Sequence, residues 1–90
     1  MDTVKIGDVV SATAGRDKGK FFLVIDADDK FAYIVDGKSR KIGKPKRKNV
    51  KHLITAADAT LISDAEKIKR GEPFGNDRLK KAINRAVKNI

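Results

Sequence analysis

A basic loop between two apolar runs constrains the fold of this sequence more than any other feature. The loop, Gly15–Lys20, reads Gly-Arg-Asp-Lys-Gly-Lys and lies between Val9-Val10 and the run Phe21–Ile25. Short apolar runs bounded by glycine-rich turns are typical of β-strands. Two glycines in six residues also permit the positive φ angles that a tight reversal needs. The sequence therefore predicts a strand, a tight loop and a second strand.

This first loop carries three cations, Arg16, Lys18 and Lys20. Its glycines leave backbone N–H groups unshielded by Cβ atoms, so the loop suits a phosphate oxygen. A solvated hairpin turn is the alternative interpretation when the loop is considered alone.

Positive charge is concentrated in the middle of the 90-residue chain, whose formal net charge is +9. Residues 37–57, the central basic segment, contain eight Lys or Arg and no Asp or Glu, whereas residues 1–36 contain five cations and seven acids. Because like charges repel, such a segment is stable either solvated or held against a polyanion. The uneven distribution favours a polyanion bound at one place. The eight cations are Lys38, Arg40, Lys41, Lys44, Lys46, Arg47, Lys48 and Lys51.

Five short strands are predicted in the first 55 residues. Their apolar patterns and turn signals place them at about Asp8–Thr13, Lys20–Asp26, Phe31–Val35, Lys38–Ile42 and Asn49–Ile54. The second is apolar throughout, so both faces of the sheet are covered or the sheet curls on itself. Strands joined mostly by tight turns predict a mainly β fold, a small antiparallel barrel over residues 1–55.

Two features of the chain between the third and fifth strands guide the connections. Asp36-Gly37 is a hairpin signal, because glycine tolerates the positive φ of a primed turn. Gly43 and Pro45 let the central basic segment follow an irregular phosphate path, and Arg40 and Arg47 can bind phosphate bidentately or stack on bases, so nucleic acid is the favoured polyanion. Gly43–Asn49 has no apolar side chain apart from proline, so we predict that it is mobile in the free protein and ordered on RNA.

Residues 56–90 are predicted to form a C-terminal helical extension. Ser63 and Glu66 fit a capping box and Gly71 fits a stop, which predicts a short helix at about Asp64–Arg70. A longer amphipathic helix is predicted from after Asn76 to the end of the chain. We expect its apolar face to dock on the barrel and its basic face to be solvated, with RNA contact or membrane-surface binding as alternatives. The apolar face comprises Leu79, Ala82, Ile83, Ala86, Val87 and Ile90, and the basic face Arg78, Lys81, Arg85 and Lys88.

Most aromatic side chains are expected in the core of so small a barrel. Adjacent residues on a strand face opposite ways, so Tyr33 and one of Phe21 or Phe22 are the expected exceptions. Exposed rings could stack on bases, form a cage for a methylated lysine or line a peptide groove. The neighbouring positive charge disfavours a basic peptide.

The sequence gives little support to catalysis, a metal site or a cofactor. Cysteine is absent and His52 is the one histidine, which excludes thiolate and multi-histidine metal sites. Asp26, Asp28 and Asp29 lack the glycine and glutamate spacing of a calcium loop and are interpreted as turn residues. We therefore expect a protein that is not an enzyme, in which His52 could donate to phosphate.

The ends and the hydropathy of the sequence bear on its location. Met1–Lys5 lacks a basic leader and an apolar run, so no signal peptide is expected. The longest apolar run has five residues, far short of a membrane span. We expect a cytoplasmic protein with no membrane partner.

Two groups of residues between positions 6 and 54 form motifs. The first is Gly7–Val10, Gly15–Lys20 and Val24; the second is Asp36–Lys38, Arg40-Lys41, Pro45–Lys48 and Lys51–Leu53. Together they resemble the KOW domains of ribosomal proteins and of NusG-type transcription elongation factors. Gly19 matches the defining glycine of that motif, while Phe22 stands where many members carry a second glycine. The chain is most similar to stand-alone bacterial KOW-domain RNA-binding proteins, which are similar to the fourteen-e class of large-subunit ribosomal proteins.

The resemblance implies an SH3-like barrel over residues 1–55 that binds RNA through its loops, with ribosomal RNA as the expected substrate. It assigns first-loop contacts to Arg16, Lys18 and Lys20, and a second contact surface to Lys38–His52. It assigns no role to residues 56–90. Because NusG-type KOW domains also bind proteins, the alternative is a protein-interaction module of the transcription or translation machinery, with ribosomal proteins or transcription machinery as partners.

Overall fold

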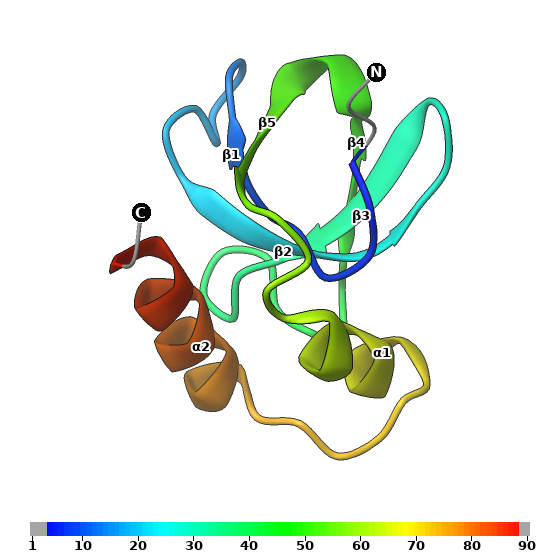
Figure 1. Ribbon diagram of the computed structural model, residues 1–90, viewed down its shortest axis with the longest axis vertical. Helices are drawn as coiled ribbons and strands as arrows, with labels where there is room; N and C mark the ends of the chain where they lie inside the picture. Colours follow the sequence, from blue (N-terminus) through cyan, green and yellow to red (C-terminus); the bar gives the residue numbers. More distant parts are fainter. Residues whose placement is uncertain (1–3, 89–90) are drawn as a thin grey trace.

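The computed structural model describes residues 4–88, in which five strands form one antiparallel sheet and two helices pack against it (Figure 1). The strand order is β4-β3-β2-β1-β5. The elements in chain order are β1 (Val9–Ala12), β2 (Phe21–Ala27), β3 (Phe31–Val35), β4 (Lys46–Asn49), the 3₁₀-helix η1 (Val50–His52), β5 (Leu53–Ala57), α1 (Ile62–Lys69) and α2 (Asn76–Lys88).

The predicted β-rich chain with an antiparallel sheet and C-terminal helices is confirmed, but the barrel is not closed. In the described part of the chain, β4 and β5 are the two edge strands and do not pair with each other. Figure 1 shows the strands curving around a common centre, with η1 bridging the two edges. The result is an open, curved sheet.

Both faces of the sheet are buried, as the apolar second strand indicates. On the face turned toward the helices, Leu23 and Ile25 pack in one cluster with Ile68 of α1 and Leu79 of α2. On the other face, Phe22 packs in a second cluster with residues of β1, β3 and β5. Because side chains alternate along β2, this strand contributes residues to two separate hydrophobic clusters, one on each face of the sheet.

The predicted fourth strand, Lys38–Ile42, is wrong, because Asp36 folds this stretch into turns. Oδ1 of Asp36 accepts hydrogen bonds from the backbone N–H groups of Lys38 (2.9 Å) and Arg40 (2.7 Å). Its Oδ2 accepts a further bond from the Ser39 hydroxyl (2.9 Å). Gly37 has the expected positive φ, +80°, but it begins a long connection and not a two-residue hairpin.

The strand that does follow β3 begins at Lys46, inside the stretch predicted to be mobile. Arg47 stands opposite Tyr33 and Lys48 opposite Ala32 in the β3–β4 register. Four of the seven residues of Gly43–Asn49 thus form an edge strand, because the free backbone edge of β3 offers hydrogen bonds whatever the side chains are.

The strand predicted at Asn49–Ile54 is also displaced. The side chain of Asn49 accepts a hydrogen bond from Lys51 N (3.0 Å) and caps η1, so β5 begins only at Leu53.

Both helices lie where they are predicted, but α1 begins earlier than expected. This helix begins at Ile62, after an N-cap residue without a side-chain capping bond, so the predicted capping box of Ser63 and Glu66 is wrong. Its end is as predicted: Gly71 has a φ of +76° and donates to Ile68 O at 3.0 Å.

On α2, the apolar face is buried through Leu79, Ile83 and Ala86, as predicted, while Ile90 lies outside the described residues. Within residues 4–88, neither helix has the length and apolar character needed to cross a bilayer.

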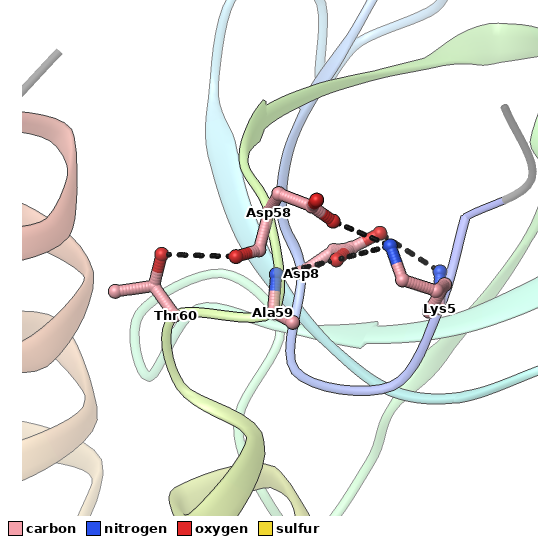
Figure 2. Close-up of polar contacts among 5 residues, drawn as sticks. All are labelled: Lys5, Asp8, Asp58, Ala59 and Thr60. Carbon is pink, nitrogen blue, oxygen red and sulfur yellow. Dashed lines mark hydrogen bonds and ion pairs between the residues drawn. The ribbon is translucent and has the colours of Figure 1, made fainter.

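A buried carboxylate fixes the passage from the sheet to α1 (Figure 2). Asp8 is fully buried, and it accepts hydrogen bonds from Lys5 N (2.8 Å) and from Ala59 N (2.7 Å), whose residue has a φ of +50°. The Lys5 ammonium lies 3.6 Å from Asp8 Oδ1 and also hydrogen-bonds to Asp58. This cluster ties the turn before β1 to the β5–α1 connection, and so positions α1 on the sheet.

Candidate nucleic-acid interface

The first loop has the backbone that its glycines predict. Gly15 and Gly19 have φ angles of +80° and +83°. Lys18 N donates to Gly15 O (3.2 Å), and Gly19 N donates to Ala12 O (2.9 Å). The loop is therefore fixed by its own hydrogen bonds, and it exposes the side chains of Arg16, Lys18 and Lys20.

An ion pair joins the first loop to the central basic segment. Nη2 of Arg40 lies 3.2 Å from Oδ2 of Asp17, whose side chain is buried. The expectation that none of the eight cations of the segment has an acid partner is therefore wrong for Arg40. This one contact of its guanidinium neutralises the acid of the loop, while its Nε is buried without a hydrogen-bond partner in the described residues.

Two further contacts bring the central basic segment against the same loop. Nζ of Lys48 donates to the carbonyl of Ala14 (3.1 Å), directly before the loop. Thr13 N donates to the carbonyl of His52 at the end of η1 (2.9 Å). The two predicted contact surfaces, far apart in sequence, are therefore adjacent in the structure.

The other cations of the predicted site are exposed and free of acid partners within residues 4–88. Arg47 lies over the ring of Phe31, with its Cζ 4.5 Å from the ring centroid, which leaves its N–H edge available. Figure 1 shows the β3–β4 connection extending toward α2, on the side of the sheet away from η1. The exposed set comprises Arg16, Lys18, Lys20, Lys38, Lys41, Lys44, Lys46, Arg47 and Lys51, and His52 is exposed beside them.

The β3–β4 connection is anchored on α2, which sequence reasoning did not foresee. Ile42 N donates to the side chain of Asn76 at the start of α2 (3.0 Å). A Cβ atom at Gly37 would lie 2.4 Å from the carbonyl oxygen of Asn76, so only glycine permits this approach. The C-terminal helix therefore holds in place the loop that carries Lys38 and Lys41.

The two exposed rings are those predicted, but the expectation that Phe31 and Phe74 belong to the core is wrong. Phe22 is fully buried, whereas Phe21 and Tyr33 are 37% and 38% exposed. Phe31 and Phe74 are half-buried, each beneath an arginine guanidinium.

Of the three acids predicted as turn residues, Asp26 lies within β2, where it pairs with Lys69 (3.2 Å), so that assignment is wrong, whereas Asp28 forms the predicted turn. Its Oδ1 accepts hydrogen bonds from Phe31 N and Lys30 N, both at 2.8 Å. The bond from Phe31, followed by that from Lys30, lowers the pKa of this carboxyl below its ordinary value of 3.8. Within the described residues, no three His, Asp or Glu side chains are grouped so that they could hold a metal ion.

Sequence reasoning missed the role of Asp17. Asp17 is an acid in a loop proposed to bind phosphate, and its charge would repel the phosphate unless another cation neutralises it. Its position between Arg16 and Lys18 is therefore the sequence feature that could have predicted an ion pair with a distant cation. No protein family model matches the chain.

Proposed function

We propose that this protein is a non-enzymatic, cytoplasmic RNA-binding module of the SH3-like KOW type, and that it binds structured RNA, with ribosomal RNA as the expected target. One observation carries the proposal: exposed cations from the first loop and from the central basic segment lie on adjacent surfaces without acid partners in the described part of the chain. RNA supplies a phosphate array of matching charge, and its irregular folds suit cations presented by loops.

The contacts between the two segments support this function in a second way. The backbone bonds of the first loop, with Arg40 on Asp17 and Lys48 on Ala14, hold it before any ligand arrives. A preorganised loop loses less conformational entropy on binding than a mobile one. Arg40 also neutralises the carboxylate that would otherwise repel a phosphate.

Binding should be largely electrostatic and should weaken steeply with salt. If three to five cations meet phosphates, the logarithm of the association constant should fall against the logarithm of salt concentration with a slope of roughly −2 to −4. Fluorescence anisotropy of a labelled, structured RNA over a series of KCl concentrations measures this slope. A slope near zero would contradict the proposal.

A pair of charge-matched variants separates the proposed surface from net charge. Changing Arg16, Lys18 and Lys20 together to Gln should weaken binding by roughly 2 kcal/mol or more, because each residue contacts phosphate. Changing Lys81, Arg85 and Lys88 on the outer face of α2 to Gln removes the same charge and should have a much smaller effect. Equal losses would show that only the total charge matters.

Crosslinking in cells tests the identity of the partner. One dominant RNA among the crosslinked sequences is the expected result. Crosslinks mainly to proteins of the transcription or translation machinery would favour a protein-interaction module instead.

A further inference from the structure

A groove of about 560 Å³ joins the predicted RNA-binding segments to the C-terminal helix. It lies between the start of β2, the β3–β4 connection and α2, and we call it the Phe21 groove. Its lining comprises Lys20, Phe21, Asp36, Lys38, Ser39, Lys80, Ile83 and Asn84.

An exposed aromatic ring forms the apolar wall of this groove. Phe21 lies on the same face of β2 as Leu23 and Ile25, the face that the helices cover. Leu23 is fully buried there, but Phe21 stands at the end of the strand and is 37% exposed. Next to it, Ile83 of α2 is 4% exposed and so adds little free apolar surface. One ring is thus available for stacking.

Three lysines line the groove together with that ring, and the carboxylate of Asp36, the one acid in the lining, already accepts hydrogen bonds. Asp36 accepts hydrogen bonds from the backbone of Lys38 and Arg40 and from the Ser39 hydroxyl. Nζ of Lys80 lies 3.1 Å from Asp77 Oδ1, but the Asp77 side chain is 88% exposed, and an exposed pair is weakly held. Lys20, Lys38 and Lys80 can therefore turn to a phosphate at little cost.

We propose that the Phe21 groove binds one unpaired nucleotide of the RNA, an inference that rests on the proposed RNA-binding function. The base stacks on Phe21, the flanking phosphates meet Lys20, Lys38 and Lys80, and the amide of Asn84 hydrogen-bonds to the base edge. A base inside a duplex has both faces covered by its neighbours, whereas an unpaired base offers a free π-face to an aromatic ring. An acidic peptide would use the lysines but would leave the ring without a stacking partner.

Two RNAs with equal numbers of phosphates test this proposal. One is a fully paired hairpin stem, and the other carries a single bulged 2-aminopurine. Phe21→Ala should weaken binding of the bulged RNA by about 5-fold to 150-fold, the range for loss of one base–aromatic stack, and should leave the paired RNA unaffected. The fluorescence of 2-aminopurine should be quenched by the parent protein and not by Phe21→Ala.

The chain offers matched controls for both the ring and the charge. Tyr33 is 38% exposed on β3, outside the groove, so Tyr33→Ala should bind both RNAs like the parent. Lys80→Gln should reduce the magnitude of the salt slope for the bulged RNA by about 1, whereas Lys81→Gln, which faces away from the groove, should not.

The outcomes distinguish this proposal from the function on which it rests. If the parent binds both RNAs equally without quenching, or if Tyr33→Ala causes the same loss as Phe21→Ala, the nucleotide site is refuted and RNA binding stands. If polyglutamate displaces the bulged RNA as effectively as unlabelled bulged RNA does, the groove recognises negative charge alone and the proposal also fails. If the parent binds neither RNA, the proposed function itself fails.

Discussion

Replacing Arg40 tests whether an ion pair holds the first loop in its place. Its Nη2 lies 3.2 Å from Oδ2 of Asp17, and the two side chains are 32% and 5% exposed. At an effective dielectric constant of about 20, unit charges at this separation attract by about 5 kcal/mol, and desolvation offsets much of that gain. Breaking a fully buried pair costs about 3 to 5 kcal/mol and an exposed pair about 1 kcal/mol or less. For this half-buried pair, Arg40→Gln should therefore lower the free energy of unfolding by about 2 kcal/mol.

Urea denaturation followed by far-ultraviolet circular dichroism measures this change, and a double-mutant cycle assigns its cause. Asp17→Asn in the Arg40→Gln background should restore about 1 kcal/mol, because it removes the buried charge left without a partner. Lys41→Gln, one residue along and exposed, should alter stability by less than about 0.5 kcal/mol. If the effects of Arg40→Gln and Asp17→Asn are simply additive, the charges do not interact and the loop is held by its backbone alone.

Three further predictions concern the loops and the turn after β2. Gly19→Val should lower the free energy of unfolding by roughly 1 to 3 kcal/mol, and Gly43→Val should lower it much less. A Cβ atom would meet nothing within 4 Å at either position, but only Gly19 has a positive φ. Equal denaturation midpoints for the two variants would refute this. Lys48→Ala should cost about 1 kcal/mol through the lost bond to Ala14, whereas Lys46→Ala, exposed on the same strand, should leave the midpoint unchanged and weaken RNA binding only. Since the pKa of Asp28 is lowered in the folded state, its stabilising contribution is full above its unfolded value near 3.8 and is lost as the pH falls through the folded value. Asp28→Asn keeps the acceptor oxygen but does not titrate, so unfolding midpoints measured below pH 4 should fall less steeply in this variant than in the parent.

The first three strands could be predicted from the sequence because local residues determine them. Phe31–Val35 agrees with β3 at both ends, and β2 differs from its prediction by one residue at each end. The glycines of the first loop have the predicted positive φ angles, since a tight reversal requires them whatever surrounds it. The burial of Phe22 and exposure of Phe21 follow from alternation along one strand.

The errors have two causes, a distant partner in some segments and a local side-chain hydrogen bond in another. Lys46–Asn49 has no apolar pattern. It forms a strand because the edge of β3 that does not pair with β2 offers its backbone groups to it. Lys38–Ile42 is predicted as a strand because it follows the hairpin signal Asp36-Gly37, but the side chain of Asp36 accepts hydrogen bonds from its backbone and folds it into turns. The pairing of Arg40 with Asp17, 23 positions apart, depends on how the two loops are placed in space, and no local pattern encodes it.

The composition of β4 also affects how molecules of this protein meet one another. As an edge strand, β4 presents unpaired backbone groups that could template pairing with another copy. Three of its four residues are Lys46, Arg47 and Lys48, and charged side chains on an edge oppose the approach of a like-charged strand. The same cations thus act as gatekeepers against edge-to-edge aggregation while the protein is free. A polyanion that neutralises these charges but is too short to cover the edge, or a salt concentration high enough to screen the charges, would remove that protection. The backbone of β4 could then pair with a strand of another molecule.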